Sequence, residues 1–568
     1  MTNVGRLVPS PASDAARVPV RFLASWLPLA LCAFGTLIVA APMLGSGFRD
    51  MLTDPGDSLL NAYLLEHSWL WLTGGPGQVG FWSPAMGYPA SGTLAYSDAM
   101  VGFGPPYWLF RALGSGPLLS MQLWMITVPA IGFFVTYGML RRAFAFSSGA
   151  AAAGAFLFAF GAPRLAQIGH QQLLPAFYLA GAFWSLAVLF GRGSGPRASR
   201  RTRRVSIMAF FACTVLQFYG GFYMGYFLVL ACAVGLAWAL ALRSTRAGVV
   251  LRLREHAVFL CGTALVASLA LAPLAWAYWS VAAEIGTRAP GVMKPMLPRL
   301  ASYFFVTPWS WLYGWMDGLP PFRSLPQPDE HALGMGLVTS GILAWVSWRQ
   351  RARPAVRIGL FTAATLVLLL TMFPAGIYLH RVPYYVIPGM SAIRAVSRIG
   401  LLLLLPAGLA LAWWIDRVPR PRSRQIVVWG VVGFCLLEQG VEIASFDKQP
   451  TQAAVTGIVE AIEPSSEAFI VTAREGGPVP SYEIHIRAML AQQRSGVPTL
   501  NLYSGNSPKG WGLAQVNVQS LAERCALERE VARWARTHAL DEGRIQRIET
   551  RGGEVIPVAM VERLHCRE

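Results

Sequence analysis

Long apolar runs separated by short polar connections make up most of this chain. A membrane-spanning helix needs about 20 apolar residues in succession, and eleven segments approach that pattern. They lie at residues 22–43, 118–140, 147–164, 172–191, 205–219, 222–242, 257–280, 332–348, 357–374, 397–415 and 426–444. Residues 101–114 are too short and too rich in Pro and Gly to cross, so we expect them to be re-entrant or interfacial. The pattern predicts an α-helical polytopic membrane protein with about eleven transmembrane helices.

The polar residues that follow the last apolar run have a different pattern. AFIVTA at 468–473 predicts a buried strand, residues 520–540 have helical periodicity, and residues 555–564 predict a closing strand. We therefore divide the chain into a tail (1–21), a transmembrane bundle (22–445) and a small C-terminal α/β domain (446–568).

Composition agrees with a membrane protein, because 54% of the residues are hydrophobic and only 13% are charged. The net charge of +18 would otherwise favour a nucleic-acid partner. The basic residues, however, lie in short connections between apolar runs, which is typical of membrane topology. The sequence therefore predicts contact with membrane lipid and no nucleic-acid partner.

The distribution of charge also predicts the orientation of the bundle. With a cytoplasmic N-terminus, the tail and the inner connections hold 23 basic residues and three acidic ones. Loops 45–100, 281–331 and 375–396 and the C-terminal domain are then periplasmic. Only three of the 47 basic residues are lysines, a bias that we interpret as that of a GC-rich bacterial genome. We expect a multi-pass protein of the bacterial inner membrane.

The cysteines do not indicate a metal site. Five lie inside apolar runs, where cysteine behaves as a small hydrophobic residue, and no Cys/His spacing resembles a zinc site. Cys525 and Cys566 lie in the polar C-terminal region and would be able to pair in an oxidising compartment.

Two carboxylates stand at the mouth of the first predicted span, in DPGDSLLNAYLLEHSW (54–69). Asp57 precedes an amphipathic run that fits a helix lying along the membrane, so it would serve as an N-cap. A carboxylate pair at this position would also be suited to act as a general base, relay protons or bind a metal. Capping and catalysis both fit the local pattern.

The wider context resembles the GT-C superfamily of membrane glycosyltransferases, which use polyprenyl-phosphate-linked sugars. A first span is followed by a long outer loop that opens on Asp54 and Asp57, and Phe81–Trp108 resembles the aromatic, Pro-rich loop of bacterial members. The resemblance covers residues 20–445. It implies an inverting glycosyltransferase with Asp57 and Asp54 as catalytic residues and an envelope glycan, lipid or protein as acceptor. In some members the acidic residues hold a divalent metal, so Asp54, Asp57 and Glu330 would instead bind Mg²⁺ or Mn²⁺.

A transferase of this kind needs cations for the donor phosphate. Arg394 and Arg398, four residues apart at the outer end of the tenth span, would share a helix face and bind that phosphate, or else reach towards lipid headgroups. His170, between the third and fourth spans, is a further candidate for the phosphate or the acceptor. Glu330 and His331 either cap the eighth span or belong to the site.

Two other classes of function remain open from the sequence. One is a transporter or flippase of lipid-linked envelope intermediates, which would favour matching halves and broken helices, and we find no matching halves. The other is a non-catalytic scaffold in envelope assembly. Glu438 and Glu442 lie inside the last apolar run and indicate either a polar path or a helix packed against the C-terminal domain.

Overall fold

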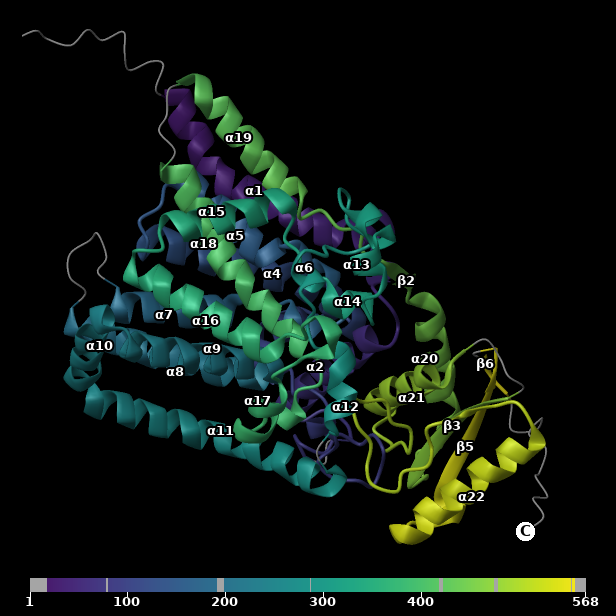
Figure 1. Ribbon diagram of the computed structural model, residues 1–568. Helices are drawn as coiled ribbons and strands as arrows, with labels where there is room; N and C mark the ends of the chain where they lie inside the picture. Colours follow the sequence, from purple (N-terminus) through teal and green to yellow (C-terminus); the bar gives the residue numbers. More distant parts are fainter. Residues whose placement is uncertain are drawn as a thin grey trace, which may run out of the picture.

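The computed structural model describes residues 18–77, 80–191, 199–286, 288–417, 422–474, 479–552 and 554–556. Most of the predicted N-terminal tail and of the closing strand at 555–564 lies outside these ranges. Figure 1 shows a bundle of long helices with the strands gathered at one end, at the right of the view.

A helix overlaps each of the eleven apolar segments. They are α1 (Val18–Gly45), α4 (Pro117–Arg142), α5 (Ser148–Phe160) with α6 (Ala162–Ala166), α7 (Phe177–Phe190), α8 (Arg200–Gly220), α9 (Phe222–Ala241), α11 (Ala257–Ile285), α15 (Leu337–Arg349), α16 (Pro354–Leu370), α18 (Leu404–Arg417) and α19 (Arg422–Leu437). Among the described residues, seven helical segments are long and apolar enough to cross a membrane. The chain is therefore a multi-pass membrane protein, and the count of eleven spans stays a prediction.

Shorter helices lie in the connections between the long ones. They are α2 (Asp57–Thr73), α3 (Gly104–Ala112), α10 (Arg243–Glu255), α12 (Pro290–Met293), α13 (Pro320–Arg323), α14 (Pro328–His331) and α17 (Arg381–Val386). The segment 101–114, predicted to be re-entrant or interfacial, contains a 3₁₀ turn at Val101–Phe103 and the nine-residue helix α3. That helix is too short to cross a bilayer.

Helix α5 forms the centre of the bundle because its small residues allow close packing. Its sequence, SGAAAAGAFLFAF, is buried from Ala150 to Phe160. A Cβ atom on Gly154 would lie only 2.5 Å from the carbonyl oxygen of Gly408 in α18. Small residues at helix crossings permit this approach in membranes, where van der Waals packing replaces the hydrophobic effect.

The buried acid Glu438, just beyond α19, has a structural role. Its carboxylate accepts hydrogen bonds from the backbone N–H groups of Val338 and Thr339 at 2.8 and 2.9 Å, and from the Tyr313 hydroxyl at 2.5 Å. These N–H groups open α15 and have no partner within that helix. Glu438 therefore caps α15 and joins it to the end of α19.

Loop 45–100 and the start of the C-terminal region are paired through backbone hydrogen bonds. Strand β1 (Asp50–Leu52) runs antiparallel to β2 (Ser445–Asp447), with Asp50 opposite Asp447 and Leu52 opposite Ser445. The two segments are far apart in sequence, because β1 follows the first long helix and β2 follows the last one. Loop 45–100 and the C-terminal region therefore lie at the same end of the bundle.

The described part of the C-terminal region contains a four-stranded sheet and three α-helices. The elements are α20 (Gln449–Ala461), β3 (Ala468–Arg474), α21 (Ser481–Ser495), β4 (Asn517–Val518), α22 (Leu521–Thr537), β5 (Ile545–Arg551) and β6 (Glu554–Val555). The strand order is β4-β3-β5-β6. Strand β3 runs parallel to both β4 and β5, whereas β6 runs antiparallel to β5. The strand predicted at 468–473 and the helix predicted within 520–540 are present. Cys525 is disulfide-bonded, while Cys566 lies outside the described residues.

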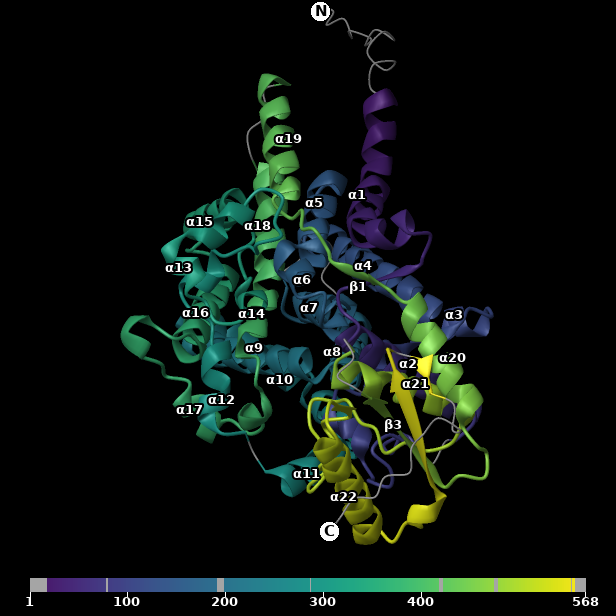
Figure 2. The same cartoon turned by 90° about the vertical axis from the view of Figure 1, so that its right-hand side faces the viewer.

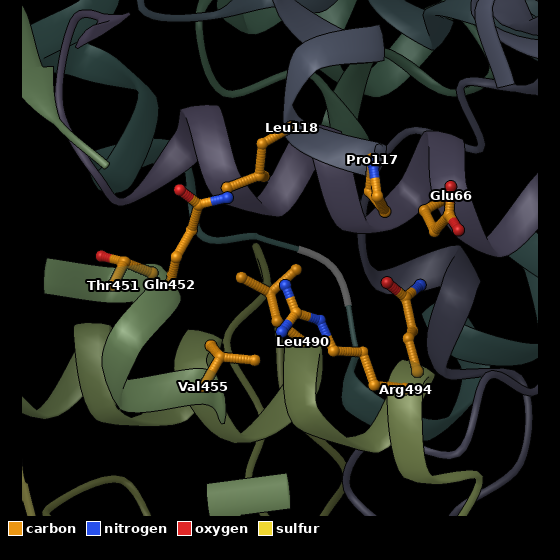
Figure 3. Close-up of a pocket in the computed structure, with 9 residues that line it drawn as sticks. Glu66, Pro117, Leu118, Thr451, Gln452, Val455, Leu490 and Arg494 are labelled. Carbon is orange, nitrogen blue, oxygen red and sulfur yellow. The ribbon is translucent and has the colours of Figure 1, made fainter. Parts of the chain in front are cut away.

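Helix α21 packs on α2, and α20 packs on α21 (Figures 1 and 2). The Gln493 side-chain amide donates to the Tyr63 carbonyl oxygen at 2.8 Å, and the Tyr63 hydroxyl donates to Gln492 at 2.9 Å. A small cavity of about 40 Å³ remains at this joint, between Glu66 of α2, Leu118 of α4 and residues of α20 and α21 (Figure 3).

We expect the end of the bundle that carries loop 45–100 and the C-terminal region to face the periplasm. In a variant without its free cysteines, Arg536→Cys in α22 should react with a membrane-impermeant maleimide in intact cells. Arg353→Cys, between α15 and α16, should react only after permeabilisation. Both arginines are exposed, so they are matched for access. Labelling in the opposite sense would contradict the orientation derived from the basic residues.

Candidate active site

Four ionisable side chains form a continuous chain at the end of the bundle next to the C-terminal region. His170 Nδ1 lies 2.8 Å from Asp57 Oδ2, and His170 Nε2 lies 3.2 Å from Glu330 Oε1. Arg398 donates to both oxygens of Glu330, at 2.5 Å from Nη2 and 3.2 Å from Nε. The structure thus brings together four of the residues singled out from the sequence.

The chain of charges is open at one end and closed at the other. The Asp57 and His170 side chains are 32% and 29% exposed, whereas those of Glu330 and Arg398 are 8% and 6% exposed. A substrate would therefore reach Asp57 and His170 first, with the Glu330–Arg398 pair behind them.

The environment favours the charged forms of Asp57, His170 and Glu330. Burial opposes ionisation of Asp57, but the hydrogen bond and charge of His170 outweigh it and lower the pKa of Asp57. Burial and the Arg398 charge act against protonation of His170, yet its bonds to Asp57 and Glu330 raise its pKa above 6.5. Burial would also raise the pKa of Glu330, but Arg398 and His170 hold it well below its usual range. The arrangement is two ion pairs in series.

Asp57 is positioned by the turn that begins α2, and it does not cap that helix. The N-cap is Gly56, without a side-chain capping bond, and Asp57 is the first helical residue. The N-cap expectation for Asp57 is therefore wrong, because its carboxylate is turned towards His170. Asp54 is exposed and shapes the turn instead, since its Oδ1 accepts the Gly56 N–H at 2.7 Å.

The residue before Asp54 is strained. Thr53 has a φ of 72°, which is unfavourable for a β-branched side chain and costs about 1–3 kcal/mol. Its hydroxyl is 2.7 Å from the Ser58 hydroxyl, which donates to the Leu52 carbonyl oxygen at 2.8 Å. These bonds hold the turn in the conformation that presents Asp57.

His170 is fixed by a buried amide network that the sequence did not reveal. The Gln171 side chain donates to Ser58 Oγ at 2.7 Å and accepts from Asn61 Nδ2 at 2.5 Å. Gln171 and Asn61 are both buried, so the turn that carries His170 is joined directly to α2. The sequence signal that could have indicated this network is Asn61, a polar residue on the apolar side of an amphipathic run.

Arg394 and Arg398 do not share a helix face, contrary to expectation. Ile393 and Ala395 have extended or irregular backbone, and a 3₁₀ helix begins only at Val396. As a result Arg398 is buried against Glu330, with its guanidinium 5.4 Å from the centre of the Tyr223 ring, whereas Arg394 is exposed. Among the described residues, the Arg394 guanidinium has no ion-pair partner.

His331 lies outside the chain of charges. Its Nδ1 is 2.7 Å from Ser302 Oγ and its Nε2 is 2.8 Å from the Pro295 carbonyl oxygen, and the ring is fully buried. Burial lowers its pKa. It therefore holds the loop at 295–302 in place. Glu330 and His331 belong to α14, so neither caps α15, which begins at Leu337.

The predicted metal-binding set is not assembled. Within the part of the chain that the structure describes, no three His, Cys, Asp or Glu side chains form a group able to hold a metal ion. Glu330 is engaged by Arg398 and His170, and Asp54 is turned towards the Gly56 N–H. Asp54, Asp57 and Glu330 therefore do not fit a common Mg²⁺ or Mn²⁺ ion in this arrangement.

Two further residues border the site that sequence reasoning did not assign to it. The Tyr503 hydroxyl, from the C-terminal region, donates to Asp57 Oδ1 at 3.2 Å. Asp98 accepts the Phe222 N–H at the start of α9 at 2.7 Å and interacts with the charges of Arg398 and His170. Burial raises the pKa of Asp98.

No family model matches the sequence, and no curated protein is significantly similar to it. Among solved structures, the chain is similar to the arabinofuranosyltransferase AftD from Mycobacteria, with 16% identity, a TM-score of 0.49 and coverage of 84% of this chain and 31% of that one. It is also similar to ArnT from Cupriavidus metallidurans bound to undecaprenyl phosphate, with 13% identity, a TM-score of 0.42 and 85% coverage of both chains.

Both neighbours are GT-C glycosyltransferases, the superfamily that the sequence resembles. This chain spans less than a third of the mycobacterial enzyme. With TM-scores below 0.5 and identities below 20%, the neighbours assign no activity or residue role here.

The His170 bridge should make stability depend on pH. Because the folded state raises the pKa of His170 above 6.5, its stabilising effect is complete below that value and is lost as pH rises through the folded pKa. We expect the melting temperature of the purified protein to fall more steeply than that of His170→Gln as the pH rises above 6.5. His538→Gln, remote from the site, is the control. Identical pH dependence in wild type and His170→Gln would contradict the bridge.

Proposed function

We propose that this protein is a membrane glycosyltransferase that moves a sugar from a polyprenyl-phosphate-linked donor to an acceptor hydroxyl at the periplasmic face of the bacterial inner membrane. The observation that carries the proposal is Asp57: a partly exposed carboxylate, held ionised by His170 and backed by the buried Glu330–Arg398 pair.

The proposed reaction uses Asp57 as general base. As the acceptor oxygen bonds to the anomeric carbon of the donor sugar, its proton passes to the Asp57 carboxylate. The bond between that carbon and the phosphate oxygen breaks, and the electron pair leaves with the polyprenyl phosphate. His170 keeps Asp57 ionised and oriented until the proton arrives. Attack from the face opposite the phosphate would invert the anomeric centre, as the GT-C resemblance implies.

The donor phosphate needs a cation that is free to approach it. Arg398 is committed to Glu330, whereas Arg394 is exposed a few residues away on the same segment. Arginine forms two-pronged, charge-assisted hydrogen bonds with phosphate oxygens. We therefore assign phosphate binding to Arg394, and we assign Arg398 the task of neutralising Glu330 behind the site.

The rival functions explain less of this geometry. A flippase of lipid-linked intermediates has no need of a strained turn that presents an ionised carboxylate to solvent. A non-catalytic scaffold would not require four charges in series with Glu330 and Arg398 buried. Burying that pair costs desolvation energy without a binding surface in return. Both rivals predict that Asp57 is replaceable.

Replacement of the proposed base should abolish transfer. Asp57→Asn, reconstituted in liposomes, should release undecaprenyl phosphate from undecaprenyl-phosphate-linked sugars about 10²- to 10⁴-fold more slowly than wild type. Asp54→Asn should be milder, because Asp54 shapes the turn without facing His170. Asp317→Asn, in an outer loop away from the site, is the matched control. Full activity in Asp57→Asn would remove the carboxylate from the mechanism.

The two arginines should behave differently when truncated. Arg394→Ala should weaken binding of undecaprenyl phosphate about ten- to a hundredfold with an unchanged melting temperature, and Arg394→Lys should restore part of it. Arg398→Ala should destabilise the fold by about 3–5 kcal/mol, because it leaves the buried Glu330 without its arginine partner. Both are measured in nanodiscs, by titration with the lipid and by thermal unfolding. Unchanged lipid affinity in Arg394→Ala would refute its assignment.

A further inference from the structure

Two tyrosines of the C-terminal region lie directly over the turn that carries Asp57. A Cβ atom on Gly56 would lie 3.2 Å from the Tyr503 hydroxyl oxygen and 3.5 Å from Cε2 of Tyr482. The Tyr503 hydroxyl also donates to Asp57 Oδ1. The turn and the two rings are therefore in contact, and a glycine at position 56 permits that approach.

The tyrosines form an aromatic surface bordered by carboxylates. Their ring centres are 5.8 Å apart and their planes are inclined by 41°. Both rings are half-buried, and Asp54, beside them, is exposed. Burial and the Asp57 charge raise the pKa of Tyr503, so its hydroxyl stays protonated and donates to the carboxylate.

The position of Tyr503 is set by residues 499–501, which are hydrogen-bonded to the backbone of two neighbouring segments. The Asn501 side chain binds the N–H and the carbonyl oxygen of Val471 in β3, at 2.8 and 3.0 Å. On the other side, the Gly87 N–H donates to the Asn501 carbonyl oxygen at 3.0 Å. Residues 499–501 are thus held between β3 and the first outer loop, and Tyr503 follows directly.

Tyr482 is not needed to attach the C-terminal region to the bundle. That attachment is made by β1 with β2, by Tyr63 with Gln492 and Gln493, and by the Trp534 indole N–H, which donates to the Tyr88 carbonyl oxygen at 2.8 Å. The half-buried ring of Tyr482 is therefore available for a ligand.

We propose that Tyr482 and Tyr503 bind a sugar ring of the acceptor and present one of its hydroxyl groups to Asp57. This inference rests on the proposed function and specifies its acceptor as a neutral carbohydrate. The C–H face of a sugar packs on an aromatic ring, and its hydroxyls donate to carboxylates such as that of Asp54. Tyr482 and Tyr503 are neutral, and Asp54 and Asp57 are acidic. The two carboxylates would repel a phosphorylated acceptor.

Binding is measured without donor, on the full chain in lipid nanodiscs free of glycoside detergents. The probes are methyl glycosides of common hexoses and pentoses, observed by saturation-transfer difference NMR. Tyr482→Ala should weaken binding of the glycoside that wild type binds best by about five- to tenfold. Tyr482→Phe, which keeps the ring, should bind within about twofold of wild type. Tyr385→Ala removes an exposed tyrosine of α17 and should have no effect.

The outcomes separate this inference from the proposed function. If wild type binds none of the glycosides, or if Tyr482→Ala binds them unchanged or Tyr482→Phe loses binding too, the aromatic acceptor surface is wrong. Release of undecaprenyl phosphate is measured in parallel. A wild type that binds glycosides through Tyr482 but releases no undecaprenyl phosphate from any donor would contradict the transferase and leave a carbohydrate-binding site.

Discussion

The imidazole of His170, placed between two carboxylates, is the contact on which the rest of the site depends. Asp57 and Glu330 come from two different loops, 45–100 and 281–331, and carry like charges, so they would repel each other without a cation between them. His170 supplies one positive charge and Arg398 the second. With the four charges balanced, Glu330 can be buried and Asp57 can remain ionised at the surface.

This balance requires segments that are distant in sequence to be held rigidly together. The buried amides of Asn61 and Gln171 join the His170 turn to α2, and α14 and the 396–403 segment deliver Glu330 and Arg398. Beneath them, the small residues of α5 and the Glu438 cap on α15 fix the helices that carry these loops. The bundle thus serves as the support that sets distances within the site.

The sequence allowed prediction of what depends on local pattern. Apolar runs located the helices, and polar residues at the ends of such runs are rare enough to single out Asp57, His170, Glu330 and Arg398. It failed where regular geometry was assumed: the backbone at 393–395 is not helical, so Arg394 and Arg398 diverge. Tyr503 was beyond prediction because it lies 446 residues from Asp57 and reaches it only through tertiary packing.

The backbone pairing of the C-terminal region with the first outer loop has a mechanical consequence. A module attached only by a flexible linker would move freely relative to the bundle. Here β2 pairs with β1 just before the Asp57 turn, and residues 499–501 are bonded to residues 85–88 just before Tyr503. Any displacement of this region would therefore disturb the Asp57 turn through β1 and would withdraw the Tyr503 hydroxyl from Asp57. The C-terminal region accordingly lines one side of the site, and its folding is coupled to the position of the proposed base, Asp57.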